Sequence, residues 1–441
     1  GQGHTQLHWN ELPGKGPWTL GASLHHTYGA GYFEQFEQGT GAIAFGLPPL
    51  VLGMDTISGG DAVQRRWLEN DFFGFNLRAL CERGPFNVKT ALVANRYIGD
   101  HFGRLISADF APAGSFPEYY SGESVKDDLS GYIQTNFQRG AWLGFLDIQV
   151  RQISYETEGT NNDLVAYDID EKYNFFNPKL GVQFTRQDWR TFLNFGVAHR
   201  EPVRSDFLVR TEIANPQPEQ LLDWELGLEK SAADHRFSVN AFYMRYNDQL
   251  VPTGELNDVG ALVRRNVDES YRAGLEISAE KNWMEKWFVR ANATFMRSRL
   301  LNWSEPVIDY GTGDVLTNNF EESPIAMSPE IMAFAELEYR PLQDLSIRLR
   351  QQYVGEQYLD NTGRADRLLD DYFVQDFFVE YALTTSFAEI QFFGACFNLW
   401  DLEYSAFGYS FNYAFNGEVI TENFLYPQAM RNFNFGIRLT F

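Results

Sequence analysis

Three observations predict an all-β protein in which an antiparallel sheet forms the wall of a transmembrane β-barrel. Residues 433–441 end the chain, and their apolar and polar side chains alternate strictly up to a terminal aromatic residue. Short turns and long polar connections alternate along the rest of the chain, and aromatic residues make up 16% of it. Period-two alternation marks strands with one apolar face, and membrane barrels combine such strands with aromatic girdles.

About 17 segments can be read as strands, an odd number where bacterial single-chain barrels have an even one. All but the last are paired around short turns rich in Gly, Pro, Asn or Asp, which accept the backbone geometry of tight turns. The predicted strands are residues 3–11, 18–28, 64–82, 86–97, 126–138, 141–155, 177–185, 189–199, 222–231, 236–248, 270–280, 287–299, 331–340, 345–355, 372–383, 387–398 and 431–441. The long connections are roughly 29–63, 98–125, 156–176, 200–221, 249–269, 300–330, 356–371 and 399–430. We expect all short turns, at Gly14, Gly84, Gly140 and Asp234 among others, to lie on one rim.

Alternation also predicts which side chains face lipid and which face the barrel interior. The set expected to face lipid is Trp18, Leu20, Leu24, Phe73, Phe75, Leu337, Ile347 and Phe435. The charged set expected to face the interior is Arg290, Arg348, Arg350, Glu276, Glu336 and Glu338. Four glycines lie within strands without a turn role, so we expect the wall to approach a domain inside the barrel there. They are Gly181, Gly196, Gly227 and Gly274.

Composition excludes several classes of protein. The formal net charge of −23 argues against nucleic acid as a partner, because nucleic acid favours basic surfaces. No run approaches the length of about 18 apolar residues that a membrane-crossing helix needs. The sequence has no catalytic Ser-His-Asp set, no metal-binding Cys or His motif and no phosphate-binding loop. We therefore expect no enzyme, no metal and no cofactor, and we expect Cys81 and Cys396 to be unpaired.

Several segments are similar to conserved motifs of one family. Residues 398–404, with the sequence NLWDLEY, are similar to the family pattern N-L-F-[DN]-x-x-Y, and Pro218-Glu219 leads to the similar segment 223–227, DWELG. The other similar segments are 177–181, 198–206, 240–250, 266–276 and 353–361. Their order and spacing make the chain resemble TonB-dependent outer-membrane receptors, specifically the iron-complex or siderophore receptor group. The resemblance covers essentially all 441 residues.

The resemblance implies that residues 1–441 are a receptor β-barrel domain, because nothing in them resembles the family's N-terminal plug. Residues 3–11 and 431–441 both run towards the short-turn rim, so they cannot pair as antiparallel neighbours. Plugged transporters have about 22 strands, so we expect about five strands and the plug to be absent from this chain or supplied by another. We also expect an open seam or a distorted closure between the first and last strands.

The resemblance further implies a function. It implies an active-transport receptor in the outer membrane of a Gram-negative bacterium, in contact with outer-membrane lipid. Such a receptor imports a bulky, scarce small molecule, of which a ferric siderophore or haem-type complex is the leading candidate. Energy would come from the TonB-ExbB-ExbD complex, acting through the missing plug. The alternative is a passive outer-membrane pore, or a barrel with only a structural or adhesive role.

Aromatic clusters in the predicted loops are the candidate ligand-binding residues, because rigid rings contribute contact area with little loss of entropy. Packing of one loop on another is an equally good explanation of the same clusters. On one hairpin, His25 also points inward by parity, together with His4 and His8. The candidate residues are Tyr28, Tyr32, Phe33, His25, Tyr119, Tyr120, Tyr409 and Phe411.

Overall fold

The computed structural model describes residues 1–11, 16–112, 118–209, 212–213, 215–256 and 262–441. The chain divides into two compact units. Unit 1 comprises Gly1–Arg139, Gly144–Leu180 and Val203–Asn215, and unit 2 comprises Gly140–Leu143, Gly181–Pro202 and Pro216–Phe441. Within the described ranges, eighteen strands belong to one antiparallel sheet, which confirms the all-β prediction. None of the helices in the described ranges is long and apolar enough to cross a membrane.

Unit 1 contains the first strands of this sheet, each paired with the next along the chain. These strands are β1 (Gln2–Asn10), β2 (Trp18–Gly41), β5 (Gly59–Arg83), β6 (Phe86–Ala108) and β7 (Glu118–Arg139), and β8 (Trp142–Thr160) and β9 (Ala166–Arg186) follow. The connection between β2 and β5 contains the short helix η1 (Ala42–Phe45) and the hairpin of β3 (Leu50–Leu52) and β4 (Asp55–Ile57). The short helix α1 (Arg204–Phe207) and the hairpin of β11 (Leu208–Val209) and β12 (Glu212–Ile213) complete the unit.

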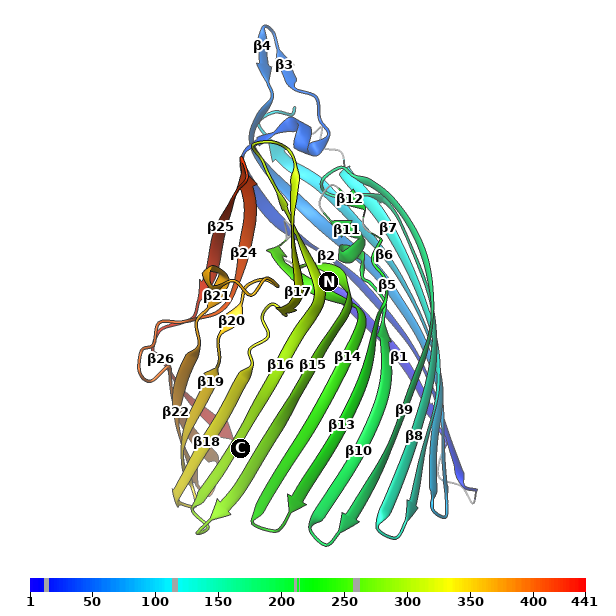
Figure 1. Cartoon of the computed structure of the whole chain (residues 1–441), viewed down its shortest axis with the longest axis vertical. Helices are drawn as coiled ribbons and strands as arrows, with labels where there is room; N and C mark the ends of the chain where they lie inside the picture. The colour runs from blue at the N-terminus through cyan, green and yellow to red at the C-terminus, as the bar shows by residue number, and fades with distance from the viewer. Residues whose placement is uncertain (12–15, 113–117, 210–211, 214, 257–261) are drawn as a thin grey trace. The chain divides into compact units, whose positions relative to one another are not determined.

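Unit 2 continues the same up-and-down pattern (Figure 1). Its strands are β10 (Trp189–Arg200), β13 (Glu219–Ser231), β14 (His235–Leu256), β15 (Leu262–Trp283), β16 (Trp287–Ile308), β17 (Val315–Pro324), β18 (Ile331–Leu342), β19 (Leu345–Val354), β22 (Tyr372–Thr384), β23 (Glu389–Phe397) and β26 (Asn432–Thr440). The connections carry β20 (Gln357–Tyr358), η2 (Ala365–Arg367), β21 (Leu368–Leu369), β24 (Ser405–Phe415) and β25 (Glu418–Pro427). Figure 1 shows the short turns of this unit at one end and the β24–β25 hairpin towards the other.

All the predicted strand segments are strands, but several extend far into the predicted loops. β2 has 24 residues and β5 has 25, so most of the predicted loop 29–63 is strand. The eighteenth strand, β17, was predicted as loop and pairs with the far half of β16. A strand crosses a membrane in about 9–11 residues. Beyond that length both faces can be polar, so the ladder of hydrogen bonds continues after the apolar alternation has ended.

The predicted faces agree with the structure. Of the side chains expected to face lipid, Trp18 is 49% exposed, Leu24 51% and Phe435 77%, and none of that set is buried. On the other face, the Glu336 carboxylate accepts hydrogen bonds from Arg290 Nη2 at 3.2 Å and Arg350 Nε at 2.6 Å. These ion pairs join β16, β18 and β19 side by side, which confirms the charged set as one face.

The strand glycines make room for rings on the neighbouring strand. A Cβ atom at Gly227 would collide with the ring of Phe192, and one at Gly274 with the ring of Phe242. Close approach to another domain was the sequence-based interpretation of these glycines. At Gly227 and Gly274, aromatic side chains of the sheet itself occupy the space. The approach of another domain to these glycines stays a prediction.

Replacing Gly227 by valine should therefore destabilise the sheet. Overpacking of this kind costs about 1–3 kcal/mol, because the Phe192 ring must leave its rotamer. Gly144→Val is the matched control, since nothing lies within 4 Å of a Cβ atom built there. The measurement is the midpoint of heat denaturation in detergent, followed by circular dichroism. Equal midpoints for the two variants would contradict the packing role of Gly227.

The first and last strands of the sheet are both exposed. β1 pairs with β2, and all nine residues of β1 are exposed. β26 pairs with β23, and eight of its nine residues are exposed. The expected seam joins strands of different units, so it stays a prediction. Phe86 pairs with Phe137, so the Gly84 turn and the end of β7 lie at the same end of unit 1. The predicted turn at Gly14 lies outside the described residues.

Candidate ligand-binding site

The predicted site residues lie on strands rather than in loops. Tyr28, Tyr32, Phe33 and His25 are on β2, Tyr119 and Tyr120 are on β7, and Tyr409 and Phe411 are on β24 in unit 2. On β2 they divide between two faces, because neighbouring residues of a strand point in opposite directions. The Tyr32 ring packs 4.5 Å from the Trp67 ring on the predicted lipid side, whereas the Phe33 ring lies beneath Arg66 on the other side. The structure brings Tyr119 and Tyr120 together, with ring centroids 5.0 Å apart.

A β-bulge at the start of β7 positions these two tyrosines. The register between β6 and β7 shifts after the Gly103–Tyr120 pair, so Tyr119 is the extra residue. Bulges re-aim side chains in this way. A Cβ atom at Gly103 would collide with both tyrosine rings, so the absence of a side chain there lets both rings pack closely against β6.

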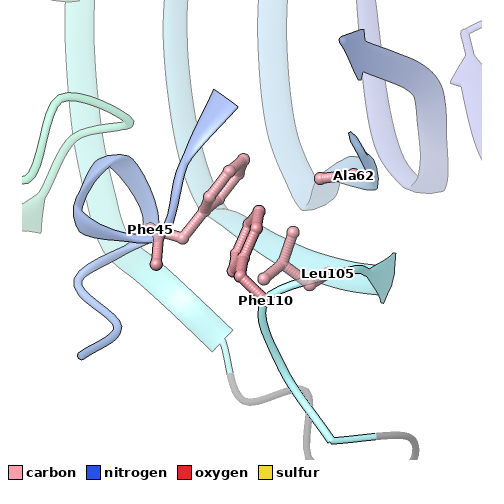
Figure 2. Close-up of a cluster of buried hydrophobic side chains, with 5 residues drawn as sticks. Phe45, Ala62, Leu105 and Phe110 are labelled. Carbon is pink, nitrogen blue, oxygen red and sulfur yellow. The ribbon is translucent and has the colours of Figure 1, made fainter. Parts of the chain in front are cut away.

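The Tyr119 ring rests on a small apolar core. Phe45, Ala62, Leu105 and Phe110 are buried and point towards one another (Figure 2). Tyr119 packs against this core edge-on to Phe45, at 5.0 Å between ring centroids, and its hydroxyl donates a hydrogen bond to Gln64. Burial raises the pKa of the Tyr119 hydroxyl to about 12, although the nearby Arg66 charge lowers it. The hydroxyl is therefore a neutral donor at physiological pH.

Two arginines flank Tyr120. Burial raises the pKa of Tyr120, and the charges of Arg66 on β5 and Arg204 on α1 both oppose that rise. Arg204 Nη2 donates a hydrogen bond to the Tyr167 hydroxyl at 2.8 Å, and its guanidinium lies 5.3 Å from the centroid of that ring. Arg66 Nε donates a long bond of 3.4 Å to Gln64. The two guanidinium groups thus act on one tyrosine.

Neither arginine has a carboxylate partner within the described ranges. In addition, the Nε of Arg204 is buried and has no hydrogen-bond partner among the described residues. Neighbouring arginines differ, since Arg65 pairs with Glu34 at 2.8 Å and Arg104 with Glu118 at 2.5 Å. The chain has a net charge of −23, yet Arg66 and Arg204 carry positive charge that no carboxylate among the described residues neutralises. Arg66, Tyr119, Tyr120, Tyr167 and Arg204 together form a group that we call the Arg–Tyr cluster.

His101 adds a titratable group beside the Arg–Tyr cluster. Burial, and then the Arg204 charge, lower the pKa of His101 from 6.5 to about 4. The unfolded chain therefore binds a proton below pH 6.5 that the folded chain does not bind until about pH 4. Stability should fall as the pH falls through this window, because protonation favours the unfolded chain.

Replacing His101 by glutamine should remove this part of the pH dependence. We expect the heat-denaturation midpoint to fall between pH 6.5 and 4.5 by more in the parent protein than in His101→Gln. His8→Gln is the control, because His8 is exposed and bonds only to Gln6 within the described residues. The idea fails if both variants keep the full pH dependence of the parent protein.

Sequence reasoning found part of the Arg–Tyr cluster. It named Tyr119 and Tyr120 but missed Arg66, Tyr167 and Arg204. Arg204 belongs to segment 198–206, which is similar to a conserved motif of the family. That similarity indicates the family of the chain but does not show that Arg204 binds a ligand. Guanidinium groups and neutral phenols are hydrogen-bond donors, so together they can hold anionic oxygen atoms.

The family model for the TonB dependent receptor-like β-barrel matches residues 2–399. The chain belongs to this family. No curated sequence is significantly similar to it. The family and the solved structures with this fold are transport receptors rather than enzymes.

Three solved structures illustrate the fold. The ferric-catecholate import receptor Fiu of E. coli K12 is 14% identical, with a TM-score of 0.67, over 99% of this chain and 63% of that one. The ferric citrate transporter FecA is 15% identical, with a TM-score of 0.67, over 100% and 61%. The copper transporter OprC is 13% identical, with a TM-score of 0.71, over 99% and 64%. The chain thus spans about three-fifths of the length of these proteins, and at such identities the likeness concerns the fold alone.

Proposed function

We propose that the chain is the barrel domain of an outer-membrane active-transport receptor of a Gram-negative bacterium. Its cargo would be a bulky, scarce iron complex of the ferric siderophore or haem type. The Arg–Tyr cluster carries this proposal, because it combines two arginines without carboxylate partners and three tyrosines on the face opposite the lipid. Hydrogen bonds from guanidinium groups to anions are stronger than those between neutral groups, so we expect the site to bind an anionic complex more tightly than a neutral one.

The proposal extends to the partners that such transport needs. Because the chain spans 63% of the length of Fiu, we propose that residues 1–441 form the barrel domain and that it works with a plug domain outside these residues. The TonB-ExbB-ExbD complex would act on that plug and supply the energy. Support comes from the family match over residues 2–399 and from the fold shared with iron-complex receptors.

Uptake measurements test the proposal. The gene segment for residues 1–441 is expressed with and without its upstream sequence in a strain that lacks its own iron-complex receptors. Uptake of a radioactive ferric tricatecholate, which carries a charge of 3−, is compared with uptake of a neutral ferric trihydroxamate. We expect uptake that needs the upstream sequence, stops when the membrane potential is dissipated and favours the anionic complex.

Two results would overturn the proposal. Uptake that continues without an energy source would indicate a passive pore. Energy-dependent uptake by residues 1–441 alone would show that no separate plug is needed.

A further inference from the structure

The β24–β25 hairpin presents a face made mostly of aromatic side chains. From Phe407 to Phe415, every second residue of β24 is aromatic and lies on this face, and the residues opposite them on β25 complete it. In register the pairs are Phe407 with Tyr426, Tyr409 with Phe424, Phe411 with Glu422, Tyr413 with Ile420 and Phe415 with Glu418. The rings of Tyr409 and Phe424 stack 4.9 Å apart, and the Phe424 and Tyr426 side chains are 43% and 46% exposed.

The opposite face of the hairpin is anchored through its β24 half. Its residues Gly408, Ser410 and Ala414 are buried. At the hairpin tip, the Asp309 carboxylate accepts hydrogen bonds from the backbone N–H groups of Asn416 at 2.9 Å and Gly417 at 2.6 Å. These contacts hold one face of the hairpin against the neighbouring loops of unit 2. On the aromatic face, the Tyr413 ring also contacts the ring of Tyr310, with 6.0 Å between the centroids.

The charge on the aromatic face has one sign. Residues 404–430 contain no lysine, arginine or histidine. The two carboxylates on the aromatic face are those of Glu418 and Glu422, and the Tyr413 hydroxyl donates to Glu422 Oε1 at 3.3 Å. The face of an aromatic ring attracts cations, and a carboxylate beside it adds to that attraction.

The spacing of the rings matches that of an extended peptide. Aromatic residues two positions apart on β24 repeat at about 6.8 Å, which is twice the rise of about 3.4 Å per residue in an antiparallel strand. Side chains on one face of an extended peptide repeat at the same distance. We propose that the aromatic face of the β24–β25 hairpin binds an extended basic peptide segment, with alternate Lys or Arg side chains lying over the rings and beside Glu418 and Glu422. This inference does not depend on the transported ligand.

Peptide binding to the purified chain in detergent tests the inference. The probes are an eight-residue peptide of alternating arginine and serine and its counterpart with citrulline, which has the shape of arginine but no charge. At about 150 mM salt, where long-range charge effects are screened, we expect the arginine peptide to bind at least about tenfold more tightly. Phe424→Ala with Tyr426→Ala, and separately Glu418→Gln with Glu422→Gln, should each weaken its binding about fivefold or more.

Matched controls separate this surface from the overall negative charge. Glu321→Gln with Asp344→Asn removes the same charge from exposed positions outside the hairpin, and Phe387→Ala removes an exposed ring. Neither control should change the affinity for the arginine peptide. Equal binding of both peptides, or equal losses in the control variants, would overturn the inference. Unchanged circular dichroism spectra would show that the exposed-residue variants are folded.

Discussion

Replacing Arg66 and Arg204 together by methionine should reduce the affinity for a ferric tricatecholate at least about 100-fold. A hydrogen bond to a charged group contributes about 1.5–3 kcal/mol, so the loss of two such interactions amounts to about 3 kcal/mol or more. Methionine retains the unbranched shape of the arginine stem, so packing on Tyr167 and Phe33 changes little. The measurement is binding to the purified protein in detergent, followed by quenching of tryptophan fluorescence.

Arg65→Met is the matched control for this prediction. Arg65 is the chain neighbour of Arg66 but points to the other face, where it pairs with Glu34 and lies 4.4 Å from the Tyr32 ring centroid. It should leave the affinity unchanged. The Arg–Tyr cluster is not the binding site if Arg65→Met has the same effect as the double variant. The same conclusion follows if the double variant loses as much affinity for a neutral ferric trihydroxamate as for the anionic tricatecholate.

Replacing Arg367 by methionine should destabilise the loops of unit 2 by about 3–5 kcal/mol, the cost of breaking a buried ion pair from one side. Arg367 is fully buried, and its Nη1 donates to Glu305 Oε1 and to Asp360 Oδ2, each at 2.6 Å. Both carboxylates are themselves nearly buried, so methionine leaves two negative charges without their counter-charge. Hydrogen exchange of the loop amides measures the effect, and we expect protection in β24 and β25 to fall by two orders of magnitude or more.

The same loop offers a control and a rescue. Arg364 pairs with Asp366 and is half exposed, so Arg364→Met should cost less than about 1 kcal/mol. Adding Glu305→Gln and Asp360→Asn to Arg367→Met removes the unpaired charges and should restore part of the protection. If Arg367→Met leaves exchange in β24 and β25 unchanged, the buried ion cluster does not hold the hairpin.

The strands could be predicted because a membrane-facing sheet leaves a local signal. Trp18, Leu20 and Leu24 alternate with polar residues, and such alternation needs no knowledge of distant parts of the chain. The extensions of β2 and β5 lack this signal, because both of their faces can be polar beyond the lipid. In the β24–β25 hairpin the signal is present, since Phe407, Tyr409 and Phe411 alternate with other residues, but it lies inside the long predicted connection 399–430.

The sequence by itself determined the fold class, the two faces of the sheet and membership of a receptor family. These properties depend on period-two patterns and short motifs, which are formed by residues close together in the sequence. Only the tertiary structure decided which charges lack a partner. Arg66 and Arg65 are adjacent and chemically identical, yet Arg65 meets Glu34 across one face while Arg66 meets Tyr120 on the other. Arg204 comes to that tyrosine from a distant segment, and the bulge at Tyr119 shifts the register where they meet. Pairing across strands is a long-range property, so no local pattern records it.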